Sequence, residues 1–422
     1  MNVRQTMDVD LRATMEVLGA NARRAAETLR TAPASVRTDA IRAMARQLRA
    51  RAAAVLEANA RDMAAATGMT DRLMLNEARV EAIAAALDQV ADLPDPVGAE
   101  LARWQRPNGL DIARVRTPIG VIGMIYESRP NVTADAAAIC VRSGNAVILR
   151  SGSEALNSAI AIHAAIAAGL EEAGLPAECV QIVPTPDRAA VGMMLEGLGG
   201  AIDLIIPRGG KTLVARVQQE ARVAVLAHLE GICHTYVHKA ADPAMAVDVA
   251  LNAKMRRVSI CGATETILID REGAAGLLPP IVDALVARDC EVRGDAEARA
   301  ADPRIVPAIE EDWSTEYLAP IVSVRVVGGL DEALDHIGRY GSGHTDSIIT
   351  EDAAAAEAFL DRLDSAIVMW NASTQFADGG EFGFGAEIGI ATGKLHARGP
   401  VGPEQLTTFK YVVRGTGQTR PV

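Results

Sequence analysis

From Ile119 onward, short aliphatic runs alternate with longer segments in which apolar residues recur every three or four positions. Strands that alternate with helices in this way form a parallel sheet joined by crossover helices, and ligands bind at the carboxyl ends of the strands. The pattern therefore predicts an α/β domain. The expected strands are 119–126, 146–150, 180–183, 202–206 and 223–227, and the expected helices are 134–142, 155–173, 187–195 and 211–221.

The same alternation resumes after Gly231 and predicts a second α/β domain. Cys261 falls inside it, on a short connection between an expected helix and an expected strand, where active-site residues usually lie. The expected elements are, in order, 234–238, 244–254, 266–270, 276–287, 321–327, 330–337, 347–350, 353–363 and 366–370.

The remaining segments predict packing helices and a hairpin. Residues 9–66 show two helical stripes broken at Pro33, with Ser35 as the expected N-cap of the second helix. Asn108-Gly109 between two apolar runs predicts a β-hairpin, and 406–414 predicts a further strand.

Composition narrows the class of protein. The 422 residues suggest two or three domains, and the net charge of −12 argues against a nucleic-acid or anionic-membrane partner. Five widely spaced cysteines without a CxxC pair argue against a disulfide framework and against a zinc site, so no metal is expected. The first residues lack an apolar signal core, and no run approaches the roughly 18 apolar residues of a membrane span. We expect a soluble cytoplasmic enzyme.

Cys261 is the candidate nucleophile. Lys254, Arg256 and Arg257 precede it, and nearby cations lower the pKa of a thiol by favouring the thiolate. This reading predicts covalent catalysis on a small anionic acyl substrate. The alternative is a buried structural cysteine beside solvated charges.

Other segments carry polar groups at expected strand ends. Asn131 could donate its amide to an oxyanion, together with the Cys261 N–H, or could cap a helix. Arg150 and Ser153 lie where a helix N-terminus could receive an anion. In Pro207-Arg208-Gly209-Gly210, small residues would let backbone N–H groups approach a pyrophosphate. Both segments are equally compatible with ordinary strand-to-helix turns.

Two glycine-rich loops complete the candidates. The first, 336–346, contains His344. It could bind substrate, or it could be a structural turn without a functional role. The second, 381–398, is long for a mere connection and ends in the cations Lys394 and Arg398.

Taken together, the motifs resemble the γ-glutamyl phosphate reductases, also called glutamate-5-semialdehyde dehydrogenases, within the aldehyde dehydrogenase superfamily. The resemblance runs from about Leu11 to Arg414. The motifs that carry it are PIGVIGMIYESRPNVTADAA, SGNAVILRSGSEA, PRGG, CHTYV, SICGATET, EYLAPI, HIGRYGSGHTDSI and EFGFGAEIGIATGKLHARGPVGPEQLTTFKY.

The resemblance implies an aldehyde dehydrogenase-like α/β fold. It implies a Rossmann-like cofactor domain at 1–102 and 118–231, a catalytic domain at 232–400 and an oligomerisation flap at 103–117 and 401–422. Cys261 is implied as nucleophile and Asn131 as oxyanion donor. Arg150, Ser153, Pro207, Arg208, Gly209 and Gly210 fall where the superfamily holds the dinucleotide, and Glu316 resembles the glutamate that holds the nicotinamide ribose.

The implied reaction is the NADPH-dependent reduction of L-glutamate 5-phosphate to L-glutamate 5-semialdehyde through a Cys261 thioester, in proline biosynthesis. The candidate substrate ligands are Arg257, His344, Lys394 and Arg398; Gln375 replaces an arginine common in the family, which leaves the anion ligands open. Implied partners are a second copy of the chain and the upstream glutamate kinase. The alternatives are a hydrolytic aldehyde dehydrogenase and a cysteine hydrolase or acyltransferase that pairs Cys261 with His228 or His344.

Overall fold

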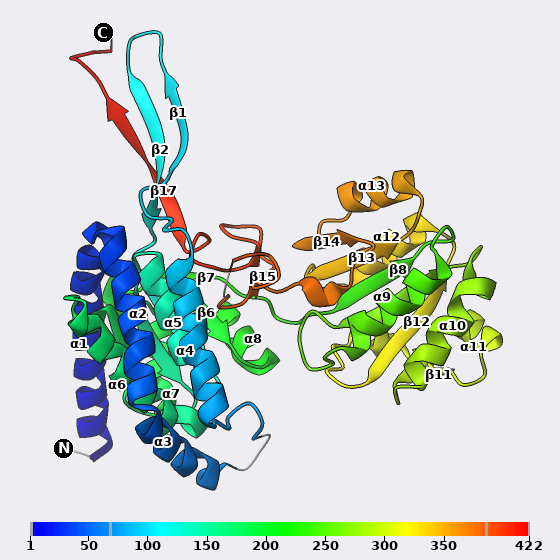
Figure 1. Cartoon of the computed structure of the whole chain (residues 1–422), viewed down its shortest axis with the longest axis horizontal. Coiled ribbons are helices and arrows are strands. Elements are labelled where there is room, and N and C mark those ends of the chain that lie inside the picture. Colours follow the sequence, from blue (N-terminus) through cyan, green and yellow to red (C-terminus); the bar gives the residue numbers. More distant parts are fainter. Residues whose placement is uncertain (1–2, 67–69, 385–386, 421–422) are drawn as a thin grey trace. The chain divides into compact units, whose positions relative to one another are not determined.

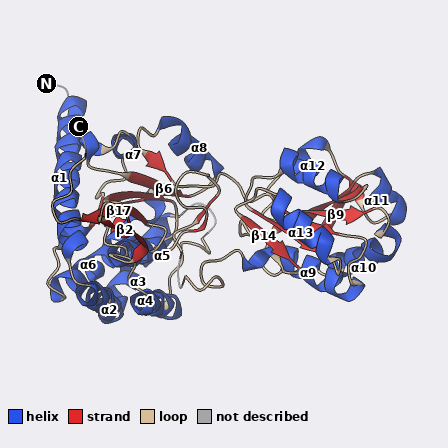
Figure 2. Ribbon diagram, turned by 90° about the horizontal axis from the view of Figure 1, so that it is seen from above, coloured by secondary structure: helices blue, strands red, loops and turns tan. Residues whose placement is uncertain are grey.

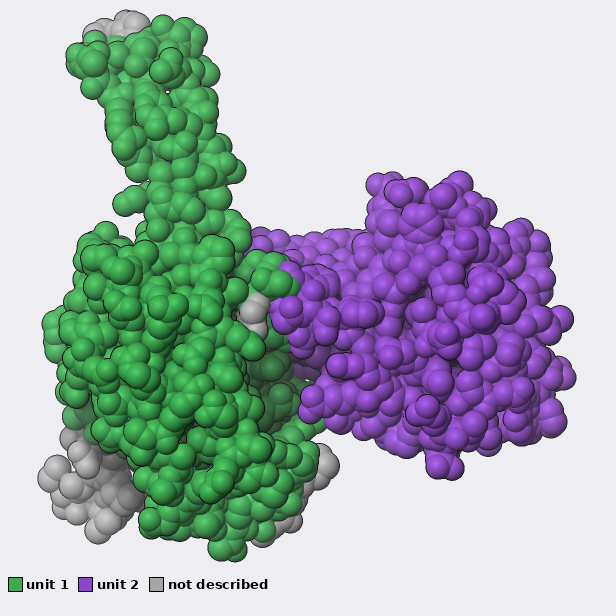
Figure 3. All heavy atoms as spheres, in the orientation of Figure 1, with its two compact units in different colours: residues 1–227, 383–389, 401–422 green, residues 228–382, 390–400 purple. Residues whose placement is uncertain are grey.

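The computed structural model describes residues 3–66, 70–384 and 387–420, and the chain divides into two compact units (Figure 3). Unit 1 comprises Met1–Ala227, Gly383–Gly389 and Val401–Val422, and unit 2 comprises His228–Phe382 and Ile390–Pro400. The predicted roles of the cofactor domain, catalytic domain and flap stay predictions. Gly385 and Ala386 of the second glycine-rich loop lie outside the described residues.

The sheet of unit 1 is parallel and has the order β5-β4-β3-β6-β7. Its two central strands are buried along their whole length, which is why they read as continuous aliphatic runs. Strand order reverses beside β3, and the strands on either side of such a point leave a crevice at their carboxyl ends. The strands are β3 (Val121–Tyr126), β4 (Ala146–Ser151), β5 (Val180–Ile182), β6 (Leu204–Arg208) and β7 (Ala224–Val225).

Helices cover both faces of this sheet (Figures 1 and 2). One face carries α1 (Val3–Thr31), α7 (Arg188–Leu195) and α8 (Lys211–Glu220). The other carries α5 (Asn131–Arg142) and α6 (Leu156–Glu172), with an outer layer built from the N-terminal part of the chain. The outer helices are α2 (Ala34–Ala50), α3 (Ala52–Ala65) and α4 (Glu77–Asp92).

The N-terminal region corrects two predictions. The expected second helix is two helices, because Arg51 leaves the helical conformation at φ −106° and ψ 14°. No proline or glycine marks that break, and the apolar stripe continues through it from Leu48 to Val55. The expected N-cap was also wrong: Pro33 occupies the N-cap position, and Ser35 lies inside the helix.

The predicted hairpin is confirmed, and the C-terminal strand joins it. Strand β2 (Asp111–Pro118) pairs antiparallel with β1 (Glu100–Gln105) on one side and with β17 (Thr407–Arg414) on the other. Gly109 has a φ of 85°, which the Asn-Gly turn favours. The three strands extend away from the layered part of unit 1 (Figures 1 and 3).

Unit 2 contains a seven-stranded parallel sheet of order β11-β10-β12-β9-β8-β13-β14. Side chains alternate between its faces, as strand geometry requires. Tyr236 and Leu268 face one hydrophobic cluster, while Val237 and Ile267 face the other. The strands are β8 (Cys233–Val237), β9 (Thr264–Asp270), β10 (Glu291–Gly294), β11 (Val306–Pro307), β12 (Ile321–Val327), β13 (Thr345–Ile349) and β14 (Ile367–Trp370).

Helices again lie on both faces of the sheet (Figure 2). One cluster includes α9 (Pro243–Met255) and α10 (Ala274–Val286), and the other includes α12 (Leu330–Tyr340) and α13 (Ala353–Arg362). The sequence pattern missed β10, β11 and α11 (Ala296–Ala301). Strand β11 has only two residues, and β10 and α11 are short and rich in charged or small residues. Among the described residues, no helix is long and apolar enough to cross a membrane.

The contact between α6 and α2 tests the packing of unit 1. A Cβ on Gly169 would lie 2.4 Å from the backbone nitrogen of Met44, whereas a Cβ on Gly192 of α7 would meet nothing within 4 Å. Gly169→Ala should therefore destabilise the fold by about 1–3 kcal/mol through overpacking. Gly192→Ala should be neutral or stabilise it by up to about 1 kcal/mol. Urea unfolding midpoints of the two variants give the comparison; equal midpoints would contradict the packing.

Candidate active site around Cys261

Cys261 lies on the connection between α9 and β9, as predicted, and is half-buried in unit 2. Its backbone is held by very close packing: a Cβ on Gly231 would lie 2.1 Å from the Cys261 carbonyl oxygen and 2.6 Å from its Cα. The Cys233 thiol donates to that carbonyl oxygen at 3.0 Å. Only glycine fits at position 231, so the segment that precedes β8 packs directly on the Cys261 backbone and fixes its position.

Two histidines flank the thiol. The Cys261 sulfur and one ring nitrogen each of His228 and His344 all lie within 4.8 Å of one another. The two imidazoles meet edge to face, with ring centroids 5.0 Å apart. His228 Nδ1 lies 2.6 Å from the Ile390 carbonyl oxygen, to which it donates. His344 is fully buried, and its Nδ1 lies 2.9 Å from the Thr345 hydroxyl.

Sheet topology explains why these residues meet. Cys261 precedes β9, His228 precedes β8 and His344 directly precedes β13, and the three strands are neighbours in the order β9-β8-β13. Because all three are parallel, their amino ends lie on the same edge of the sheet. In unit 2, therefore, the cluster forms at the amino ends of the strands.

The histidines set the charge state of the thiol. Burial by itself raises the pKa of Cys261, but the charges of His344 and His228 and their hydrogen bonds outweigh it, so the pKa lies well below its ordinary value. The two histidines thus favour the thiolate, the reactive form of Cys261. The sequence correctly predicted that the pKa of Cys261 is lowered. It wrongly assigned the cause to the cations that precede Cys261, because the largest favourable contributions come from the two histidines.

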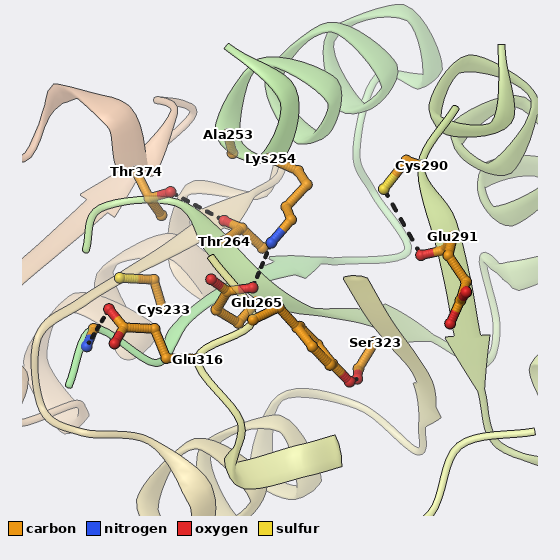
Figure 4. A network of polar contacts seen from close by, with 12 residues as sticks. Cys233, Ala253, Lys254, Thr264, Glu265, Cys290, Glu291, Glu316, Ser323 and Thr374 are labelled. Atoms are coloured by element: carbon orange, nitrogen blue, oxygen red, sulfur yellow. Dashed lines mark hydrogen bonds and ion pairs between the residues drawn. The ribbon is translucent and has the colours of Figure 1, made fainter. Parts of the chain in front are cut away.

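Lys254 has a different partner. It is fully buried and forms an ion pair with Glu265, also fully buried (Figure 4). Burial raises the pKa of Glu265 to about 7, against the opposing effect of Lys254. The pair joins the last turn of α9 to the start of β9, so it clamps both ends of the loop that carries Cys261. Removing one partner of such a buried pair costs about 3–5 kcal/mol.

Gln375 also stabilises the loop that carries Cys261. Its side-chain amide donates to the carbonyl oxygens of Ala253 at 2.8 Å and Arg257 at 3.3 Å. At the start of β9, the Thr264 hydroxyl lies 3.0 Å from that of Thr374 (Figure 4). The residue that replaces the family arginine therefore supports the loop backbone.

Glu316 also lies in this region. One carboxylate oxygen accepts the Gly231 N–H at 3.0 Å (Figure 4). Burial raises the pKa of Glu316, and the Cys261 charge raises it further. Its predicted contact with a nicotinamide ribose stays a prediction.

The predicted oxyanion donor lies in unit 1. Asn131 is the first residue of α5, and Pro130 takes the N-cap position without a side-chain cap, so the capping alternative was wrong. The Asn131 amide donates to Asp135 at 2.9 Å. Burial raises the pKa of Asp135 to about 6, opposed by that hydrogen bond and by Arg208. Pairing of Asn131 with Cys261 stays a prediction.

Six of the predicted dinucleotide residues lie at the carboxyl ends of β6 and β4 in unit 1. Gly210 is the N-cap of α8, and its N–H donates to the Glu127 carboxylate at 2.8 Å. A carboxylate thus occupies the anion position at this helix N-terminus. Pro207 and Arg208 end β6, and a Cβ on Gly209 would lie 2.5 Å from Glu127 Oε2.

Arg150 and Ser153 lie at the end of β4. Arg150 is buried and donates to the carbonyl oxygens of Ser151 and Pro186, each at 2.8 Å. Burial and the neighbouring Arg188 lower its pKa. Ser153 is exposed and opens a 3₁₀ turn. A cofactor role for these residues stays a prediction.

The remaining predicted substrate ligands lie in unit 2. Lys394 and Arg398 both form ion pairs with Asp364, the latter at 2.7 Å. Arg398 also approaches the His344 loop, since its Nη2 lies 4.0 Å from the Cβ position of Gly343. Arg257 is exposed on the Cys261 loop. Substrate binding by any of them stays a prediction.

Comparison with known proteins agrees with this architecture. The model of the aldehyde dehydrogenase family matches residues 6–289. The chain is 67% identical over 419 residues to a gamma-glutamyl phosphate reductase of Caulobacter sp. strain K31, covering 98% of this chain and all of the relative. It is 62% identical over 418 residues to the reductase of Rhodospirillum rubrum, covering 98% of each.

A solved structure supports the same assignment. The crystal structure of gamma-glutamyl phosphate reductase from Thermotoga maritima matches with a TM-score of 0.94 at 43% identity, covering 96% of this chain and all of the other. The predicted α/β aldehyde dehydrogenase-like fold is confirmed. On full-length similarity of this degree, the chain belongs to the gamma-glutamyl phosphate reductases of the aldehyde dehydrogenase family.

Proposed function

We propose that the chain reduces L-glutamate 5-phosphate to L-glutamate 5-semialdehyde and phosphate, a step of proline biosynthesis in the cytoplasm. Support comes from relatives named gamma-glutamyl phosphate reductase that match over nearly the full length. The observation that carries the chemistry is the position of the Cys261 thiol beside His228 and His344, which lower its pKa and favour the thiolate.

The reaction follows from a resident thiolate. The Cys261 sulfur attacks the acyl carbonyl, a C–S bond forms, and phosphate leaves with the electrons of the C–O bond. An acyl phosphate has a good leaving group, so acylation needs no strong acid. After the thioester is reduced, collapse of the thiohemiacetal releases the aldehyde and returns the thiolate. His228 and His344 stabilise that anion, and Asn131 with the Cys261 N–H is the proposed oxyanion site.

NADPH is the proposed reductant, and when bound it supplies the hydride that reduces the thioester. The residues of unit 1 fit a dinucleotide phosphate. The α8 N-terminus accommodates an anion, since the Gly210 N–H binds the Glu127 carboxylate, which a cofactor phosphate would have to displace. The Nε atoms of Arg150 and Arg208 are buried without a hydrogen-bond partner among the described residues. These two guanidinium groups would complete the anion site, and Arg150 would bind the 2′-phosphate of NADPH.

Two alternatives remain distinguishable. A hydrolytic aldehyde dehydrogenase uses water activated by a glutamate, yet Glu265 is engaged with Lys254, and Glu316 accepts the Gly231 N–H. A cysteine hydrolase is favoured by one observation, the histidines beside the thiol, because such pairs activate nucleophiles in that class too.

Phosphate dependence separates these functions. With L-glutamate 5-semialdehyde and NADP⁺, the reverse reaction should produce NADPH only when phosphate or arsenate is present, because phosphate must release the acyl group from Cys261. The rate should saturate with phosphate. Cys261→Ala should lower this rate by several orders of magnitude, whereas Cys290→Ala, which alters a buried cysteine of the same unit, should keep it.

Rapid NADPH production without phosphate, with free glutamate as product, would replace this function with hydrolytic oxidation. Absence of NADPH formation under every condition, together with hydrolysis of acyl esters, would favour the cysteine hydrolase.

We also propose that the chain forms a homo-oligomer through the β1-β2-β17 sheet. Phe409, Tyr411 and Val413 alternate along β17, and their exposed fractions are 45%, 57% and 54%. Trp104 of β1 packs edge to face on Tyr411 at a centroid distance of 6.1 Å. A row of exposed apolar side chains on an extended sheet is typical of an interface. The upstream glutamate kinase stays a candidate partner.

Replacing Phe409 and Tyr411 together by serine should remove most of the apolar contact and shift the chain toward smaller species. Ile160→Ser, which alters an exposed apolar side chain of α6, is the control. Sedimentation at several concentrations measures the result. An unchanged assembly in the double variant would place the interface elsewhere, and a monomeric parent chain would remove the proposal altogether.

A further inference from the structure

The Cys261 thiol and the two imidazoles beside it are also a set of potential metal ligands. Imidazole and thiolate are the groups that bind Zn²⁺, and catalytic zinc sites combine three protein ligands with an open fourth position. This site could not be recognised from the spacing of cysteines along the chain, because its three donors come from separate segments. Strand order in unit 2 brings those segments together.

Donor spacing is compatible with one shared ion. Zinc–nitrogen bonds of about 2.0–2.1 Å and zinc–sulfur bonds of about 2.3 Å place tetrahedral ligands about 3.5 Å apart. The Cys261, His228 and His344 donors lie within 4.8 Å of one another, so none of the three separations has to shorten by more than about 1.5 Å. Rotation of side chains can supply a change of this size.

The outer contacts of both histidines suit metal binding. A metal-ligating histidine usually donates its second ring N–H to a carbonyl or another acceptor, which fixes the ring. His228 Nδ1 donates to the Ile390 carbonyl oxygen at 2.6 Å, which leaves Nε2 as the ring nitrogen that can bind a metal once its proton has left. His344 Nδ1 lies 2.9 Å from the Thr345 hydroxyl, which leaves its buried Nε2 as the ring nitrogen that can bind a metal.

Cys233 has a supporting position. Its thiol donates to the Cys261 carbonyl oxygen at 3.0 Å, and its sulfur lies 3.6 Å from His344 Nδ1. Cys233 is buried and its sulfur already makes these two contacts, so we leave it out of the proposed ligand set. The ligand set is therefore one cysteine and two histidines.

We propose that Cys261, His228 and His344 form a binding site for a thiophilic divalent cation of the Zn²⁺ class, and that its occupation inhibits the enzyme. The cation takes the sulfur lone pair that otherwise attacks the substrate. When the two imidazole nitrogens bind the cation, any proton they carry leaves to solvent. The affinity for the cation therefore falls as the pH falls. Cation binding does not depend on the proposed reductase function; inhibition does.

Co²⁺ is the direct probe, because a cobalt–thiolate bond gives a charge-transfer absorption in the near ultraviolet. The full chain should bind one Co²⁺ with that band, and Zn²⁺ should displace it. Cys261→Ala should abolish the band. His228→Ala and His344→Ala should each weaken binding by at least about 100-fold, as loss of a ligand exceeds loss of an outer contact. His396→Ala, at an exposed histidine of the same unit, should bind like the parent.

His228→Gln and His344→Gln serve as second variants, and metal-free thermal midpoints verify that each variant is folded. Zn²⁺ should also inhibit the reductase, with recovery on adding a chelator, which separates metal binding from oxidation. A folded, active chain without the cobalt–thiolate band, or with unchanged affinity after loss of either histidine, would overturn the metal site alone. A normal band in a chain without reductase activity would instead overturn the proposed function.

Discussion

Charge compensation at Cys261 is the interaction on which the chemistry of the molecule depends. A buried thiolate is unfavourable by itself, and the pKa of the other four cysteines is raised by burial. At Cys261 the imidazoles of His228 and His344 reverse that tendency. The same thiolate explains nucleophilic attack on an acyl phosphate and affinity for a thiophilic cation, and the two processes compete for one lone pair.

The fold supplies this arrangement through two kinds of constraint. Topology places the starts of β9, β8 and β13 side by side, which gathers three distant segments. Local contacts then fix the loop: Gly231 packs on the Cys261 backbone, and the Lys254–Glu265 pair joins the two elements that flank it. In unit 1 the candidate cofactor residues instead lie at the carboxyl ends of β4 and β6. The two sheets thus present opposite strand ends to their candidate ligands.

Much of the fold could be predicted from periodicity, because buried parallel strands and amphipathic helices leave strong patterns. The elements that the sequence pattern missed have identifiable physical causes. Arg51 interrupts a helix without any breaker residue, the four-residue strand β10 is rich in charged residues, and the edge strand β11 has only two residues. Cys261 could be identified from its loop, but its two histidine neighbours were named only for the alternative of a cysteine hydrolase. Nearness in sequence suggested Lys254, which pairs with Glu265, whereas His228 and His344 act across the sheet.

The most direct test is the pH dependence of Cys261 alkylation, followed by mass spectrometry of its peptide. The lowered pKa predicts that iodoacetamide reacts rapidly at neutral pH and that the rate falls only in acid. In His228→Gln and His344→Gln the midpoint should move to higher pH, so alkylation on the acid side slows by about ten-fold for each pH unit that it moves. The four buried cysteines should react slowly throughout. A Cys261 profile with the midpoint of an ordinary thiol, unchanged in both variants, would contradict the account.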